Sequence, residues 1–184
     1  MRPLRRVRTK VIAQARGRVL EIGVGTGMNF VRYGDIESLD GIEPDPHMLA
    51  RARKRTAGLP FPVRLQQVGA EALPFADDSF DTVVATWVLC TIPDPRTALV
   101  EMRRVLKPGG RLLFAEHVRS RFPRAARLQD FLAPAWKKLG GGCCLNRRSL
   151  ELIAAAGFAQ VSFKPCGRES WRLVPHYRGS AVKP

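Results

Sequence analysis

The stretch RVLEIGVGTGMNF, residues 18–30, joins a short apolar run to three glycines at alternate positions. The apolar run predicts a buried strand, and Gly23, Gly25 and Gly27 allow the backbone to turn sharply and to approach a ligand closely. In an open α/β sheet, ligands bind beyond the carboxyl ends of the strands, which is where these glycines fall. A glycine-rich turn is weak evidence by itself, because it also occurs as a tight turn without a ligand.

Expected strands and helices alternate along most of the chain. The apolar patterns predict strands at 18–22, 38–42, 63–68, 81–86 and 111–116, and helices at 27–33, 46–56, 95–106, 123–138 and 147–156. The KPGG segment at 107–110 predicts a helix stop followed by a turn. Alternation of this kind is typical of βαβ units, which form a parallel sheet with helices on both faces.

The pattern changes after residue 157. Residues 158–165 and 170–174 are expected to be two strands with a short connection, which implies an antiparallel pair. The sequence therefore predicts an α/β fold with a Rossmann-like, doubly wound, mostly parallel seven-stranded sheet and an antiparallel C-terminal strand pair. The length of 184 residues suits a single domain over 1–184, with a substrate-side insertion at 117–146 that could close as a lid.

The first sixteen residues are expected to form a basic amphipathic helix. Its apolar positions are Leu4, Val7, Val11 and Ile12, and most of its basic residues lie off that stripe. Such a helix either packs on the domain, covers its pocket, or makes a peripheral contact with a membrane surface. The residues alone leave these three alternatives open.

Composition limits the classes of partner. The net charge of +15 suits nucleic acid, anionic lipid or an acidic metabolite, but the basic residues are scattered and no separate RNA-binding module fits in the chain. A nucleic-acid partner is therefore disfavoured. No apolar run is long enough to span a bilayer and no secretory signal follows the start, which predicts a soluble cytoplasmic protein. The four cysteines form no C-x-x-C pair, so we expect reduced thiols and no metal site.

Two carboxylates define the expected ligand. Glu21 lies two residues before Gly23, and Glu43 ends the second expected strand, 20 residues after Gly23, where an acid can hold both ribose hydroxyls. The glycines follow a G-x-G-x-G pattern and not G-x-G-x-x-G, so the pyrophosphate fingerprint is not met. The ligand is therefore expected to be a nucleoside that carries positive charge and no phosphate, and S-adenosylmethionine fits this description.

Five motifs then resemble, in order and spacing, those of class I S-adenosylmethionine-dependent methyltransferases. They are VLEIGVGTG (19–27), GIEPDPHML (41–49), GAEALPF (69–75), FDTVVATWVL (80–89) and RVLKPGGRLLFAEH (104–117). The resemblance implies that the cofactor is S-adenosyl-L-methionine and that the product is S-adenosyl-L-homocysteine. The cofactor-binding residues that it implies are Glu21, Gly23, Gly25, Thr26, Gly27, Glu43, Pro44, Met48, Ala70, Glu71, Thr86 and Trp87.

The resemblance also implies a division of roles within the site. Glu21 would face the methionine end, Glu43 would hold the ribose, and Thr86 with Trp87 would lie by the transferable methyl group. Many relatives have Asp where Gly69 stands, so recognition of the adenine is expected to rest on backbone groups near Ala70 and Glu71.

The second half of the chain is similar to the methyltransferase-like 7 group, known as alkyl-thiol S-methyltransferases. The similarity lies in EHV (116–118), LAPAWKKLGGGCCLNRRS (132–149) and SWRLVPHYRGSAVK (170–183). The matching positions are Glu116, His117, Pro134, Trp136, Cys143, Leu145 and Arg147. Those relatives begin with a hydrophobic membrane anchor, whereas this sequence begins with a basic helix, and they carry an acid where Ala133 stands.

This narrower resemblance implies methyl transfer to a small-molecule acceptor, with a thiol as the implied acceptor. His117 is the catalytic candidate, because an imidazole beside Arg147 could accept the thiol proton or supply positive charge. The alternative for His117 is a hydrogen-bonded structural histidine. Two other functions stay open: methylation of a phospholipid amine or quinone precursor at a membrane surface, and a non-catalytic cofactor-binding module. The sequence does not indicate the oligomeric state.

Overall fold

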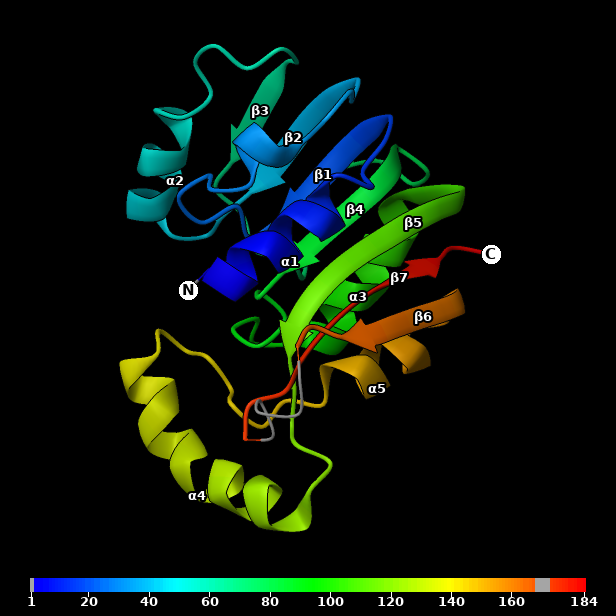
Figure 1. Ribbon diagram of the computed structural model, residues 1–184. Coiled ribbons are helices and arrows are strands. Elements are labelled where there is room, and N and C mark those ends of the chain that lie inside the picture. The colour runs from blue at the N-terminus through cyan, green and yellow to red at the C-terminus, as the bar shows by residue number, and fades with distance from the viewer. Residues whose placement is uncertain (1, 168–172) are drawn as a thin grey trace.

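The computed structural model describes residues 2–167 and 173–184, which form a seven-stranded sheet in the order β3-β2-β1-β4-β5-β7-β6 (Figure 1). The strands are β1 (Arg18–Ile22), β2 (Ser38–Ile42), β3 (Val63–Gln66), β4 (Phe80–Thr86), β5 (Leu106–His117), β6 (Ala159–Pro165) and β7 (His176–Val182). The strands β1 to β5 pair in parallel, and β7 runs antiparallel to both β5 and β6. The predicted fold class is confirmed.

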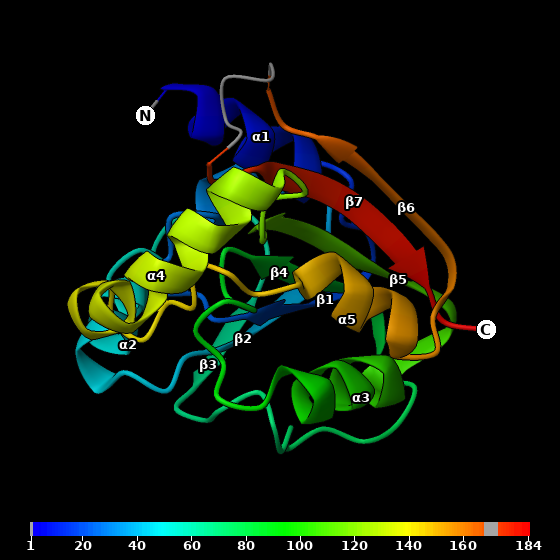
Figure 2. The same ribbon diagram turned by 90° about the horizontal axis from the view of Figure 1, so that it is seen from below.

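Helices cover both faces of this sheet (Figure 2). They are α1 (Arg2–Ile12), α2 (Pro46–Arg53), α3 (Pro95–Val105), α4 (Pro123–Leu139) and α5 (Ser149–Ala155). One buried cluster joins α1 and α2 to the sheet, and a second joins α3 and α5 to it. The neighbours Val19 and Leu20 of β1 fall in different clusters, because successive strand side chains point to opposite faces.

The expected helix at 27–33 is wrong. The structure has turns there, followed by the short 3-10 helix Phe30–Arg32. Gly27 has φ +77°, and a Cβ on it would lie 2.6 Å from the Phe30 ring and 3.2 Å from the Ala52 backbone. The chain is therefore pressed against α2, and the side chain of Asn29 is buried. No α-helix starts at the glycine turn, so a helix dipole does not contribute to ligand binding there.

Two further boundaries differ from the sequence expectation. Helix α3 ends before 107–110 as predicted, but β5 begins at Leu106 and includes these four residues. The strand bends sharply there, because Gly109 has φ +75° and the pairing with β4 changes register between Phe80 and Thr82. Backbone hydrogen bonds join the bend to the end of the chain, since Lys183 N donates to Gly110 O at 2.9 Å and Gly109 N donates to Lys183 O at 3.0 Å. The expected strand at 170–174 falls partly outside the described residues, and the described strand β7 begins at His176.

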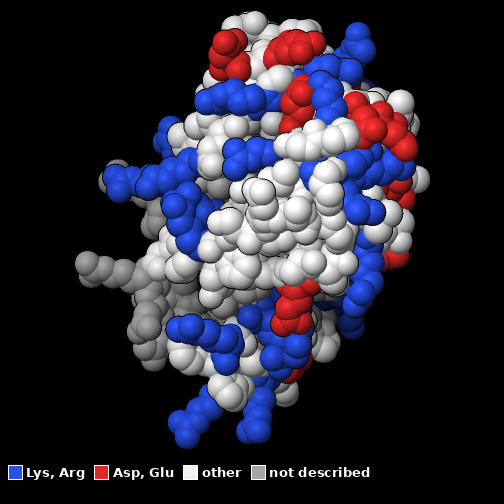
Figure 3. All heavy atoms as spheres, turned by 90° about the vertical axis from the view of Figure 1, so that its right-hand side faces the viewer, with Lys and Arg blue, Asp and Glu red and all other residues white. Residues whose placement is uncertain are grey.

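Basic side chains do not gather into one patch on the face of the molecule shown in Figure 3. There, Lys and Arg side chains are interspersed with acidic and uncharged residues, as their scatter along the sequence predicts. Among the described residues, no helix combines the length and the apolar character needed to cross a bilayer.

Candidate cofactor and acceptor site

A cavity of about 450 Å³ lies at the carboxyl ends of β1, β2 and β4, within the size range of small-molecule sites. Eight of the predicted cofactor residues line it: Gly23, Gly25, Glu43, Pro44, Met48, Ala70, Glu71 and Trp87. These residues come from four separate segments, which meet at the switch point between β1 and β4, where the order of the parallel strands reverses.

Glu43 fixes the first two strand ends against each other. Its Oε2 accepts a hydrogen bond from Gly25 N at 2.8 Å, and its Oε1 accepts one from Asp45 N at 3.1 Å. Each carboxylate oxygen has room for a further donor. The buried carboxylate is therefore fixed in position beside bare backbone while it can still accept the hydroxyl groups of a ligand.

Gly23 allows the loop after β4 to approach the turn after β1. It has φ +64°, and a Cβ on it would lie 2.4 Å from the side chain of Val88. Gly69 is different, because a Cβ there would lie 2.9 Å from Glu71 Oε2. The Glu71 carboxylate thus occupies the space next to position 69.

Glu21 is buried behind the cavity and does not line it. Asn29 Nδ2 donates to its Oε1 at 2.6 Å and Tyr33 OH donates to its Oε2 at 2.8 Å. Asn29 Nδ2 also lies 3.1 Å from Thr86 Oγ1, so Thr86 belongs to the same network. Burial raises the pKa of Glu21 to about 7, and the hydrogen bonds from Tyr33 and Asn29 oppose that rise.

Thr26 and Gly27 also lie outside the cavity wall and support the glycine turn from behind. Arg55 Nη1 donates to Thr26 O at 2.7 Å, and Gly27 packs against α2. Four predicted cofactor residues therefore surround the turn without lining the cavity: Glu21, Thr26, Gly27 and Thr86.

Arg8 of α1 joins the site, which the sequence did not reveal. Its Nη1 donates to Asn29 Oδ1 at 2.7 Å, and its guanidinium carbon lies 4.9 Å from the centre of the Trp87 ring. Val7 and Val11 of the same helix are buried against the core. Helix α1 therefore packs on the domain against β5 and β7, with Arg8 reaching the end of β4, as one of the three alternatives for this segment predicts.

Trp87 follows β4 directly and has a strained backbone conformation. Its φ is +53°, which bulky residues rarely adopt, and its backbone N donates to Ala115 O at 2.7 Å. Its buried Nε1 has no hydrogen-bond partner in the part of the chain that the structure describes. Trp87 lines the cavity, and a buried donor without a partner is unusual in a folded protein.

Beyond Trp87, three side chains from distant segments meet. His117 Nε2 lies 3.1 Å from Cys143 Sγ, and the ligand atoms of Cys90, His117 and Cys143 all lie within 4.8 Å of one another. Cys144 N donates to Cys90 O at 2.8 Å, which joins the turn after α4 to the loop after β4. Residues 117–146 contribute Gly141 to the cavity wall.

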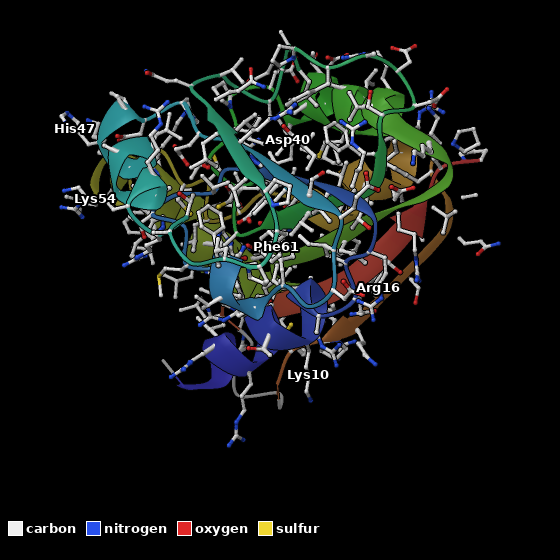
Figure 4. All side chains as sticks on the ribbon, turned by 90° about the horizontal axis from the view of Figure 1, so that it is seen from above. Lys10, Arg16, Asp40, His47, Lys54 and Phe61 are labelled. Atoms are coloured by element: carbon white, nitrogen blue, oxygen red, sulfur yellow. The ribbon has the colours of Figure 1, made fainter. Side chains whose placement is uncertain are left out.

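Cys90, His117 and Cys143 shift one another's pKa values. Hydrogen bonds from Cys90 and His117 hold the pKa of Cys143 below its usual range, while the bond to Cys143 and burial raise the pKa of Cys90. Burial is the largest effect on His117 and lowers its pKa, but the hydrogen bond and charge of Cys143 together with the charge of Glu116 raise the pKa above its usual value. His47, by contrast, points outward from α2 and has no part in the site (Figure 4).

Glu116, the residue before His117, binds the backbone of the loop after β4 from the buried side. Glu116 Oε1 accepts hydrogen bonds from Val88 N at 2.8 Å and Leu89 N at 3.0 Å. Its Oε2 is buried and has no partner among the described residues. Burial raises the pKa of Glu116 to about 7.

The charge of the cavity wall decides which ligand fits. Its described lining includes Glu43, Asp45 and Glu71 but neither lysine nor arginine, although the chain carries 31 basic residues. A phosphate-bearing dinucleotide would meet only negative side chains there. A nucleoside with a sulfonium and an ammonium group fits the carboxylates and the apolar wall at Met48.

Comparisons with known proteins agree with this site. A family model described as a methyltransferase domain matches residues 20–114. The human thiol S-methyltransferase TMT1B is 36% identical over 182 residues, covering 95% of this chain and 75% of that protein. A phosphatidylethanolamine N-methyltransferase from Cereibacter sphaeroides is 40% identical over 127 residues, covering 67% of this chain and 62% of that protein.

Solved structures share the fold of this chain. The crystal structure of the YcgJ protein from Bacillus subtilis superimposes with a TM-score of 0.76 at 21% identity, covering 99% of this chain and 98% of that one. The chain belongs to the class I S-adenosylmethionine-dependent methyltransferases. Within that class it lies near the TMT1 group, and S-adenosyl-L-methionine is its cofactor.

Replacement of Glu43 tests the carboxylate clamp. We expect Glu43→Ala to weaken S-adenosylmethionine binding by about 1.5–3 kcal/mol, because hydrogen bonds to a charged acceptor are lost. Isothermal titration calorimetry measures this change. Glu37→Ala is the matched control, since Glu37 is exposed just before β2, at the opposite end of that strand. Equal affinity of Glu43→Ala and wild type would remove Glu43 from the cofactor site.

Stability should depend on pH through Glu21. Its pKa of about 7 lies above the unfolded value of 4.5, so the folded state binds more protons between these values. Stability therefore falls as pH rises through this window, by about 2–3 kcal/mol from this group in the cofactor-free protein. Chemical denaturation at about pH 5 and pH 8 measures the free energy of unfolding of wild type and Glu21→Gln, with Glu37→Gln as control. Parallel profiles for wild type and Glu21→Gln would contradict the assignment.

Proposed function

We propose that this enzyme methylates the sulfur of a small thiol in the cytoplasm. One observation carries the proposal: the similarity to thiol S-methyltransferases extends over 95% of the chain and so includes residues 117–146 at the acceptor end. The similarity to the phosphatidylethanolamine N-methyltransferase covers 67% of the chain. The acceptor end is the part that distinguishes methyltransferases with different substrates, because the cofactor part is shared.

The proposed cofactor residues act by binding and orientation. When bound, S-adenosylmethionine supplies an electrophilic methyl group, and the acceptor must be aligned with it while water is excluded. We assign Glu43 to the ribose, Met48 and Pro44 to the adenosine wall, and Ala70 with Glu71 to the adenine edge. Glu21 and Thr86 support the methionine end through Asn29.

The acceptor end supplies groups suited to sulfur. Arg147 Nη1 donates to Ile92 O at 2.9 Å, and Ile92 lines the cavity, so a fixed positive charge lies next to the cavity wall. Positive charge near a thiol favours the thiolate, which is the nucleophile. We assign His117 as the residue that accepts the proton of the acceptor thiol or supplies positive charge to its sulfur, because its imidazole lies beside Cys143 at the same end.

An acceptor screen tests this proposal. Small alkyl thiols should give S-adenosylhomocysteine, whereas phosphatidylethanolamine vesicles and quinol precursors should give none. Turnover with a phospholipid or quinol but with no thiol would overturn the proposed substrate class.

A variant of His117 tests its assigned role. His117→Ala should lower kcat for a thiol by about 10²–10⁴-fold, the range of a positioned acid–base group, and leave cofactor affinity nearly unchanged. His47→Ala is the control, because His47 is exposed on α2. Equal turnover of His117→Ala and wild type would make His117 a structural residue.

We also propose a peripheral membrane contact, but through α4 more than through the basic N-terminal helix. Val7, Val11 and Ile12 of α1 are buried in the core, which leaves mainly its basic residues available to lipid. On α4, Phe131 is 81% exposed and Leu139 is 87% exposed, next to Lys137 and Lys138. An exposed apolar helix face with flanking lysines suits the surface of an anionic bilayer. Figure 1 shows α4 projecting beyond the carboxyl end of β5.

Co-sedimentation with vesicles tests this contact. The protein should bind phosphatidylglycerol vesicles at low salt and lose most of that binding at high salt, because basic residues supply part of the affinity. The double variant Phe131→Ser with Leu139→Ser should bind less than wild type, while Val31→Ser, at an exposed position outside α4, should not change binding. Equal binding by wild type and the α4 double variant would exclude α4 as the contact.

A further inference from the structure

Cys90, His117 and Cys143 come from three segments that are far apart in the sequence. Cys90 lies in the loop after β4, His117 ends β5, and Cys143 lies in the turn after α4. We propose that these three residues, the Cys–His cluster, bind one Zn²⁺ ion. The expectation of no metal site came from cysteine spacing along the chain, which cannot reveal ligands that only the fold brings together.

The distances within the cluster suit a tetrahedral ion. Zinc binds sulfur at about 2.3 Å and nitrogen at about 2.0 Å, so its ligand atoms lie roughly 3.5–4 Å from one another. The three ligand atoms of the cluster lie within 4.8 Å of one another, and the His117–Cys143 pair is at 3.1 Å. Small side-chain rotations therefore convert the present arrangement into a coordination shell.

The chemistry of the three side chains also suits zinc. Two thiolates and one neutral imidazole balance the double charge of the ion, which favours its burial. Binding would release the remaining thiol protons to solvent. Trp136 makes a side-chain hydrogen bond to the sulfur of Cys143, the kind of outer contact that orients a metal ligand. The surrounding charges are those of Glu116 and Arg147.

The fourth position of the ion would be open. Within the described residues, the group of possible ligands at this distance contains these three members, and the sulfur of Cys144 contacts Arg147 and Gly142 O instead. Three protein ligands with one open position are typical of catalytic zinc. The residues on either side of the cluster line the cavity, namely Val88, Thr91 and Gly141. Occupation of the open position by a thiolate rests on the proposed function, whereas binding of the metal does not.

Metal binding is tested on the full chain without acceptor or cofactor. Protein purified in reductant without a metal-affinity tag should contain one zinc per chain. After removal by a chelator, added Co²⁺ should give a thiolate-to-cobalt charge-transfer band. Absence of both stoichiometric zinc and this band in the reduced wild type would overturn the proposal, as would a Cys90–Cys143 disulfide that persists in reductant.

Matched cysteine variants locate the ligands. Cys143→Ser should weaken Zn²⁺ binding by at least about 100-fold, and Cys144→Ser should leave it nearly unchanged. Affinity for S-adenosylmethionine reports whether each variant is folded, and equal zinc binding by a folded Cys143→Ser would overturn the assignment. If Cys143→Ser does not fold, the cobalt spectrum of the wild type decides whether the cluster binds a metal.

The open position has its own test. Ethanethiol added to the cobalt form should shift the charge-transfer band. An unchanged spectrum would overturn the open position. Because neither measurement uses methyl transfer, failure here is distinguishable from failure of the acceptor screen.

Discussion

The hydrogen bond from Gly25 N to Glu43 is the interaction on which the cofactor site depends. It joins the turn after β1 to the end of β2 and places a buried carboxylate against exposed backbone. The bond forms because parallel pairing puts the carboxyl ends of β1 and β2 side by side. Glycine at position 23 then allows the loop after β4 to close the other side. The arrangement that we propose for nucleoside binding therefore follows from strand order and from three residues, Gly23, Gly25 and Glu43.

Charge is distributed unevenly between the site and the rest of the molecule. A chain with a net charge of +15 places only carboxylates among the charged residues that line its cavity. Arg8 approaches the site from behind, where it contacts Asn29 and the face of Trp87 and not the cavity wall. Its positive charge opposes the effect of burial on Glu21, so α1 is electrostatically linked to that carboxyl group as well as packed on the domain.

Much of the fold and part of the candidate site could be predicted from the sequence. The alternation of apolar runs predicts the parallel strands, and the position of Glu43 at a strand end predicts its place beside the glycine turn. The network of Glu21, Asn29 and Tyr33 could not be predicted, because a regular helix was expected where Gly27 packs against α2. The Cys–His cluster left no local signal either, since its members meet only after α4 returns the chain to the loop after β4. Residues 170–172 lie outside the described part of the chain, so the structure does not test that portion of the expected strand.

The central claim is that the cavity accepts a cationic nucleoside and excludes a phosphorylated one. Calorimetric titration of the wild type with S-adenosylmethionine and, separately, with NAD measures it most directly. The carboxylate-lined wall predicts saturable, one-to-one binding of S-adenosylmethionine and no detectable heat from NAD at the same concentrations. Comparable affinity for both ligands, or binding of NAD alone, would contradict the account.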